Sequence, residues 1–226
     1  MKSKLLKSVL FLSMFMLIAS SFSFGSNFAS AAENDKKSSF KEEINEINVE
    51  VPYKKSEVKI EKSKNDQSES MEVIDIKTNK VLRTYTVEDV DAPIALASNK
   101  NAALANTTFK DVSETRDDNG LETTLRARLE IYSSGSFAQI QDIVSYNWFT
   151  SSGNHTLESE SADGLSTSGS FPTNEVEILG DATIQAAISQ SASAGFEAAG
   201  FSISAGTGST YYARKDISIG FRYSIY

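Results

Sequence analysis

Apolar and polar residues alternate along several segments in the second half of the chain. Between Leu121 and Tyr132, every second residue from Leu125 to Ile131 is apolar, and the residues between them are arginine or glutamate. This alternation predicts a half-buried β-strand, because successive side chains of a strand point to opposite faces. Segments 175–186 and 217–225 alternate in the same way. We therefore expect an antiparallel strand at each of the three segments.

The residues between these strands predict turns and one irregularity. Segment 137–149 is β-rich, but its alternation breaks around Asp142 and Ile143, which predicts a bulge. Asn119-Gly120 is typical of a type I′ hairpin turn, since both central residues need a positive φ. Segment 181–190 is rich in alanine and leaves a short helix as an alternative to a continued strand.

These elements together predict the fold class of residues 106–226. Several antiparallel strands with short turns, and no long amphipathic helix, favour an all-β domain. We expect an antiparallel β-sandwich or a flattened barrel. Its outward faces are polar, so each sheet should meet solvent on one side.

The composition of residues 32–105 is different. This segment has dense mixed charge, no glycine and three aromatic residues, which predicts a largely flexible charged arm or pro-segment. Within it, a capping-box pattern and helical spacing predict a short helix over 39–48. Segment 54–70 is expected to be a mobile tether, and 71–87 a β-hairpin. The alanine- and asparagine-rich stretch 93–106 is expected to link the arm to the β domain.

The first 31 residues have the pattern of a secretory signal peptide. A basic start is followed by the apolar stretch Val9 to Ala19 and by Ala29-Ser30-Ala31, a small-residue cleavage pattern. The apolar stretch is shorter than the roughly 20 residues that cross a bilayer, and no second long apolar run exists. We expect no transmembrane helix after signal removal. The signal alone gives the chain a general likeness to exported bacterial, Gram-positive preproteins, so we expect a secreted protein, released or associated with the cell wall.

Charge and residue inventory exclude several functions. The formal net charge is −8, and removal of the basic signal makes it more negative, so we expect no nucleic-acid partner. The chain has no cysteine and one histidine. Disulfide frameworks, thiolate metal sites, cysteine nucleophiles and multi-histidine metal centres are therefore excluded.

Two groups of residues suggest hydrolytic chemistry, and each has a simpler interpretation. His155 could serve as a general base, but it lies in a turn-like stretch and is expected to be an exposed loop residue. Glu158 with Glu160, and Glu175 with Glu177, are spaced to share one face of a strand, as paired catalytic carboxylates would. Acidic residues at alternate positions are equally typical of any solvent-facing strand. We therefore expect a protein that is not an enzyme.

The acidic turn before the first predicted strand suggests calcium. Asp117, Asp118 and Asn119 are the candidate ligands for Ca²⁺. Laid on the EF-hand loop pattern, however, the first ligand position falls on Thr115 and the twelfth on Arg126, so the pattern fails at both ends. A hairpin turn explains the same residues without a metal ion.

Four aromatic residues near predicted strand ends are candidates for ligand binding. Tyr146 and Trp148 belong to one segment, which also places the aromatic Phe149 near a strand end, and Tyr211 and Tyr212 belong to another. Such rings can stack on sugar rings, and they can equally close the core of a sandwich. The partners we expect are a cell-wall polymer, a carbohydrate or a protein.

Segment 180–210 is rich in glycine, alanine and serine, with occasional large apolar residues. Close packing in a sandwich explains this composition, and a membrane-inserting hairpin over 196–205 is the alternative. The sequence thus favours a secreted, non-enzymatic binding protein of the bacterial cell envelope or extracellular space. The alternative is a secreted pore-forming or antimicrobial effector held inactive by a pro-segment at 32–105.

Overall fold

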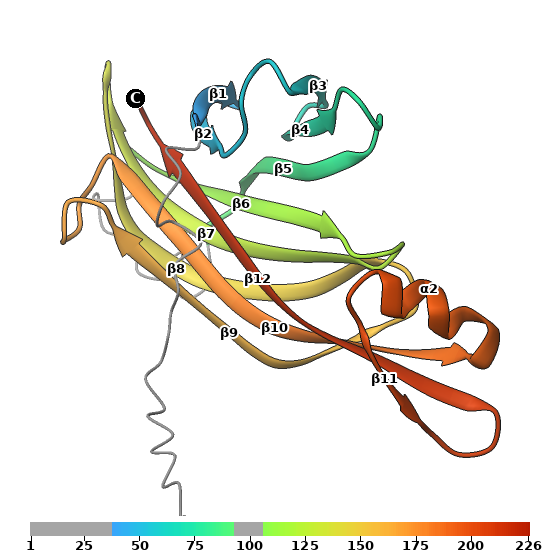
Figure 1. Ribbon diagram of the computed structural model, residues 1–226. Coiled ribbons are helices and arrows are strands. Elements are labelled where there is room, and N and C mark those ends of the chain that lie inside the picture. The colour runs from blue at the N-terminus through green and yellow to red at the C-terminus, as the bar shows by residue number, and fades with distance from the viewer. Residues whose placement is uncertain (1–37, 93–105) are drawn as a thin grey trace, which may run out of the picture. The chain divides into compact units, whose positions relative to one another are not determined.

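The computed structural model describes residues 38–92 and 106–226, which form two antiparallel β-sheets packed against each other (Figure 1). The predicted all-β sandwich is confirmed. The expected signal peptide at 1–31 and nearly all of the expected linker at 93–106 lie outside the described residues.

We call the first sheet sheet A. Its strand order is β1-β2-β12-β10-β9, and β11 pairs with β12 on the same edge as β2 but near the other end of that strand. Its strands are β1 (Phe40–Ile44), β2 (Ile47–Val51), β9 (Thr156–Ser166), β10 (Glu175–Ser189), β11 (Ser202–Ala205) and β12 (Thr210–Ser224). The second sheet, sheet B, follows the chain in the order β3-β4-β5-β6-β7-β8. Its strands are β3 (Val58–Lys64), β4 (Ser68–Asp75), β5 (Val81–Val90), β6 (Thr107–Asp117), β7 (Glu122–Ser134) and β8 (Phe137–Ser152).

The larger hydrophobic core lies between the two sheets. Leu125 and Leu129 of β7 are fully buried, as their alternation with arginine predicted, and they belong to one cluster with Ile178 of β10 and Tyr223 of β12. Each fully buried side chain of this size stabilises the fold by about 1.5–3 kcal/mol. Inward-facing residues at every second position of the long strands thus pack the two sheets against each other.

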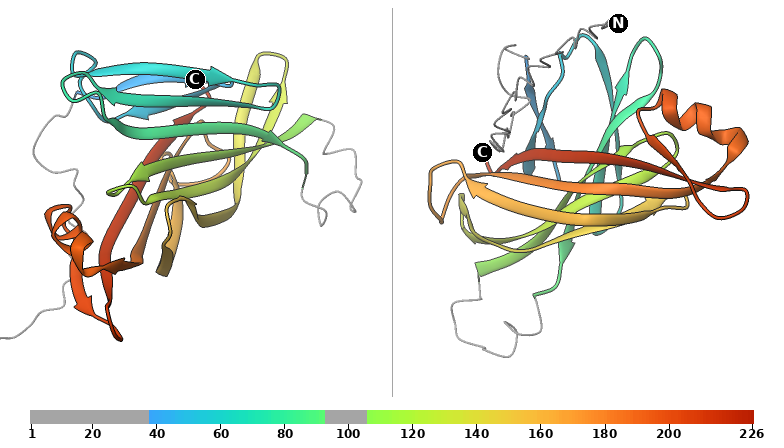
Figure 2. Two further views of the ribbon diagram at one scale, coloured as in Figure 1. Left: turned by 90° about the vertical axis from the view of Figure 1, so that its right-hand side faces the viewer. Right: turned by 60° about the horizontal axis from the view of Figure 1, so that its bottom comes forward.

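A smaller core lies beneath the segment that connects β10 and β12. Here the chain forms a 3₁₀ turn, η2 (Gln190–Ala192), a short helix, α2 (Ser193–Ala198), and β11, at one end of the long strands (Figures 1 and 2). Phe201 is 4% exposed and meets the ring of Phe196 edge to face at 5.0 Å. Close packing therefore accounts for the buried residues of 180–210, and part of 196–205 is α2 instead of a strand. The membrane-inserting hairpin over 196–205 stays a prediction.

Several local predictions are confirmed. Asn119 and Gly120 have φ values of 60° and 83° in the turn between β6 and β7. The pairing of β7 with β8 shifts register near Ile143, where the bulge was predicted. Strand β10 continues to Ser189, so the short helix considered at 181–190 is absent.

The predicted helix at 39–48 is wrong. These residues belong to the hairpin of β1 and β2, and Asn45 and Glu46 form its turn with φ values of 44° and 67°. Ile47, Val49 and Val51 alternate with polar residues and are buried. Burial of this period-two face outweighs the helical spacing, because β-branched side chains pack well on a sheet.

The predicted tether at 54–70 is also wrong. It contains β3 and the beginning of β4, and β3 is an edge strand paired on one side. Val58 is buried, while most of the other side chains of β3 are charged and exposed. Lysine-rich edge strands resist pairing with other molecules, so the charge that suggested disorder instead protects a sheet edge. The predicted hairpin at 71–87 is confirmed as β4 and β5.

The expected boundary at 105/106 does not separate two parts of the fold. Strand β5 pairs with β6 over seven residue pairs, from Thr84 with Thr115 to Val90 with Phe109, and β2 pairs with β12. Residues 38–92 therefore complete both sheets and are not a weakly ordered arm. Within the described ranges, no helix has the length and apolar character needed to cross a membrane.

Candidate functional site

The two sheets meet along the edges of β8 and β9, two strands that are consecutive in the chain but do not pair with each other. We call this region the seam. Strand β8 ends sheet B and pairs with β7, while β9 ends sheet A and pairs with β10. A side chain bridges the two edges, because the indole Nε1 of Trp148 donates a hydrogen bond to the carbonyl oxygen of Ser161 at 2.8 Å. The seam therefore places an aromatic residue of one sheet against the backbone of the other.

Two glycines leave room for the aromatic rings of the seam. A Cβ at Gly180 would lie 2.8 Å from Cζ2 of Trp148, and one at Gly164 would lie 2.5 Å from the hydroxyl oxygen of Tyr146. Both rings also pack against the larger core. The rings are thus held in place before any ligand arrives, which lowers the entropic cost of binding.

A β-bulge in β9 separates the two carboxylates that alternation assigned to one face. Opposite β10 the register shifts, so that Ser159 and Glu160 together oppose one residue, and Ser159 has a φ of 54°. Glu158 faces outward and pairs with Arg214 at 3.1 Å. Glu160 lines the seam instead. The expected shared face of Glu158 and Glu160 is therefore wrong, because the extra residue of the bulge reverses the alternation.

The seam contains an open hollow of about 360 Å³, which we call the seam hollow. Its lining residues are Tyr146, Asn147, Trp148, Glu160, Ser161 and Ala162. Two aromatic rings for contact and a carboxylate for polar interaction are side chains that small-molecule sites combine.

The local charge of the seam hollow is negative. Burial, together with the charges of Asp163 and Asp142, raises the pKa of Tyr146, so its hydroxyl stays protonated at neutral pH. Within the described part of the chain, Glu160 has no hydrogen-bond or ion-pair partner, and its residue is exposed. A ligand would therefore find a free carboxylate next to two aromatic rings.

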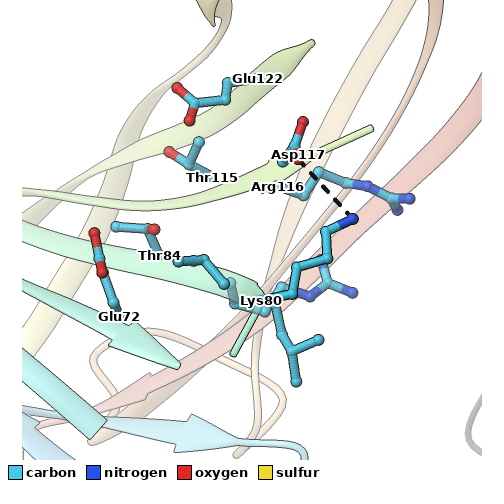
Figure 3. A pocket seen from close by; sticks show the side chains of 10 residues that line it. Glu72, Lys80, Thr84, Thr115, Arg116, Asp117 and Glu122 are labelled. Atoms are coloured by element: carbon cyan, nitrogen blue, oxygen red, sulfur yellow. Dashed lines mark ion pairs between the residues drawn. The ribbon is translucent and has the colours of Figure 1, made fainter. Parts of the chain in front are cut away.

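A second hollow, of about 270 Å³, lies on the outer face of sheet B (Figure 3). Glu72, Thr84, Thr115 and Glu122 line it from β4 to β7, and Lys80 pairs with Asp117 at 4.0 Å across it. Aromatic side chains are absent from its lining. Because its lining includes no aromatic ring, it is the weaker candidate for a ligand that stacks on aromatic side chains.

The candidate calcium ligands have other partners. Asp118 is 5% exposed, and its carboxylate accepts hydrogen bonds from Arg116 at 2.7 and 2.8 Å and from Lys215 at 2.8 Å. Burial opposes the charge of Asp118, but these cations outweigh burial and lower its pKa. Asp117 accepts a bond from the backbone of Gly120, and Asn119 occupies the turn.

The turn between β6 and β7 therefore offers no pair of free carboxylates to calcium. In residues 38–92 and 106–226, three or more histidine or acidic side chains nowhere converge as a metal site would require. The carboxylate of Asp118 instead ties this turn to Lys215 of β12.

The expectation that His155 is an exposed loop residue is wrong. His155 is 9% exposed, and its Nε2 lies 3.1 Å from the hydroxyl of Thr123, which is fully buried. Burial lowers the pKa of the imidazole, so it is neutral at pH 7. A substrate cannot reach a hydroxyl with no exposed surface, so this pair packs the interior instead of acting on a ligand.

The four aromatic candidates do not form one surface. Tyr146 and Trp148 line the seam hollow together. Tyr211 and Tyr212 lie on β12 opposite Ile188 and Ala187, where β11 pairs on the other side, and they line neither hollow. The structure thus separates the predicted ligand residues into one pair at a hollow and one pair elsewhere.

A buried acidic residue was not predicted. Glu114 faces inward from β6, is 1% exposed and pairs with Arg83 of β5. Burial raises the pKa of Glu114 to about 7, although Arg83 acts in the opposite direction. Val112, two residues earlier on the same face, was the available signal that position 114 points into the core.

No protein-family model matches this chain, and neither a curated protein nor a solved structure shows significant similarity to it. The residues of the seam hollow are therefore the observations that bear on function.

Proposed function

We propose that the protein is a secreted, non-enzymatic binding protein of the bacterial cell envelope, and that it binds carbohydrate in the seam hollow. The observation that carries this proposal is the bulge at Ser159, after which Glu160 lines the seam hollow together with Tyr146 and Trp148. A positive φ at a residue other than glycine is unfavourable, and bulges that redirect side chains are frequent beside functional sites.

The chemistry of the hollow suits a sugar. The apolar face of a pyranose ring packs on an aromatic ring, while its hydroxyl groups donate to carboxylates and exchange hydrogen bonds with amides. Trp148 and Tyr146 supply the rings, and Glu160 supplies a carboxylate. Secretion is supported by the signal pattern of residues 1–31, and a binding role by the absence of an accessible base beside a nucleophile at His155.

Binding to purified bacterial peptidoglycan tests this proposal. We expect the protein to sediment with insoluble peptidoglycan and the Trp148→Ala variant to remain in solution. The matched control is Phe149→Ala, because Phe149 is the next residue of β8, is 38% exposed and contacts Arg126 away from the seam hollow. Retention of binding in Phe149→Ala with loss in Trp148→Ala supports the proposal.

Two further measurements keep the test decisive. Circular dichroism of Trp148→Ala shows whether it folds, and Tyr146→Ala is the second variant expected to lose binding. Absence of sedimentation by the unmodified protein, both with peptidoglycan as isolated and with peptidoglycan whose amino sugars have been deacetylated, contradicts the proposal. Release of dye from liposomes by the same protein would favour the pore-forming effector instead.

A further inference from the structure

The carboxylate of Glu160 lacks the cation partner that several other glutamates of sheet A have. Glu158 pairs with Arg214, Glu177 with Arg222 and Glu175 with Lys41, each at 3.0–3.1 Å. Within the described residues, no cation pairs with Glu160. The seam hollow therefore contains one negative charge that the protein itself leaves uncompensated.

The cationic side chains that strand pairing brings nearest to Glu160 have other partners. Arg126 lies opposite Asn147 but stacks on Phe149 and lies 3.6 Å from the carboxylate of Asp111. Arg214 is occupied by Glu158 and by Gln185 on the outer face of sheet A. A neutral sugar would donate hydroxyl hydrogen bonds to Glu160 and leave its charge unmatched.

A protonated amine fits this arrangement better than a hydroxyl group. Hydrogen bonds between an ammonium group and a carboxylate are roughly twice as strong as neutral ones. The faces of Trp148 and Tyr146 carry negative π density, which also attracts a cation. An ammonium group on a pyranose ring would thus bring its charge to Glu160 while the ring covers the aromatic side chains.

We propose that the seam hollow selects amino sugars that are not acetylated, with the ammonium group on Glu160 and the ring against Trp148. This inference rests on the proposed carbohydrate binding and names its ligand class. Acetylation of the amine removes the positive charge and adds bulk, so the structure predicts discrimination between two sugars that differ by one acetyl group.

Titration calorimetry with two oligosaccharides tests the selectivity. The probes are the β-1,4-linked tetramer of glucosamine and the corresponding tetramer of N-acetylglucosamine, at a pH where the amine is protonated and at low salt. We expect the glucosamine tetramer to bind about 10-fold more tightly, the effect of one charge-assisted hydrogen bond. In Glu160→Gln this preference should disappear.

Glu158→Gln is the matched control. Both variants remove one negative charge from a protein of net charge −8, so a non-specific attraction between an acidic protein and a cationic sugar would weaken equally in both. Glu158 faces away from the seam hollow and pairs with Arg214. A preference lost in Glu160→Gln and retained in Glu158→Gln supports the inference.

The outcomes separate this inference from the proposed function. Equal binding of the two tetramers overturns the selectivity and leaves carbohydrate binding intact. Failure of both tetramers and of peptidoglycan to bind contradicts both proposals. A third probe, trilysine, carries ammonium groups without a sugar ring, and binding of trilysine as tight as that of the glucosamine tetramer would overturn the assignment to a sugar.

Discussion

Buried Glu114 makes the stability of the protein depend on pH in a direction opposite to that of most carboxylates. The pKa of this group is raised by burial from 4.5 to about 7. Below pH 4.5 the carboxyl group is protonated in the folded and unfolded states. Between pH 4.5 and 7 the folded state keeps the proton that the unfolded state releases, so the free energy of unfolding falls as pH rises.

The size of this effect follows from the two pKa values. At 1.36 kcal/mol for each pKa unit, a rise from 4.5 to about 7 corresponds to roughly 3 kcal/mol lost between acidic and neutral pH. His155 acts in the opposite direction, because its lowered pKa makes the folded state bind fewer protons than the unfolded state below pH 6.5. The contribution of Glu114 must therefore be isolated by a variant.

The Glu114→Gln variant isolates it. Glutamine does not titrate, and the guanidinium of Arg83 stays charged throughout, so the difference in unfolding free energy between the two proteins varies with pH only through the ionisation of Glu114 beside Arg83. Urea unfolding followed by the fluorescence of Trp148, the single tryptophan, gives the free energy of unfolding at each pH. Relative to Glu114→Gln, the unmodified protein should lose roughly 3 kcal/mol between pH 4.5 and 8. Parallel stability curves for the two proteins would refute the reasoning.

Three further predictions follow from other parts of the structure. Gly180→Ala should cost about 1–3 kcal/mol of unfolding free energy, because its Cβ would lie 2.8 Å from Trp148, whereas Gly195→Ala, with open space around it, should cost nothing measurable in the same urea titration. Leu129→Ala should cost about 2–5 kcal/mol by the same assay, since Leu129 is fully buried in the larger core, and a smaller loss would show that the core closes around the deletion. Calcium chelation should leave the thermal unfolding midpoint unchanged, because the carboxylate of Asp118 already binds two cationic side chains, and a shifted midpoint would restore the calcium hypothesis.

The strands that could be predicted from the sequence are those with one face buried from solvent. Alternation around Leu125 and Leu129 identified β7, because most inward residues of this strand are apolar where the facing sheet excludes water. Strand β3 could not be found in this way. It is at a sheet edge and needs few inward residues, of which Val58 is buried, so its lysines and glutamates resemble those of a disordered segment.

The candidate site was predictable in part for a related reason. Tyr146 and Trp148 stood out as aromatic residues near strand ends, and the structure places both at the seam hollow. The position of Glu160 depends on one extra residue in β9. The alternation rule assumes that no extra residue interrupts the strand, so it placed Glu160 with Glu158 on one face. The position of Glu160 at the seam hollow could be found only from the actual pairing of β9 with β10.

The ladder between β5 and β6 has a consequence for proteolytic maturation. A cut in the chain between residues 92 and 106 would leave the pieces on either side joined by this ladder and by their shared core. Such a cut would produce a nicked, non-covalent heterodimer instead of releasing an inhibitory pro-segment. The same arrangement suits fragment complementation, since neither piece alone can bury the apolar face that the other covers.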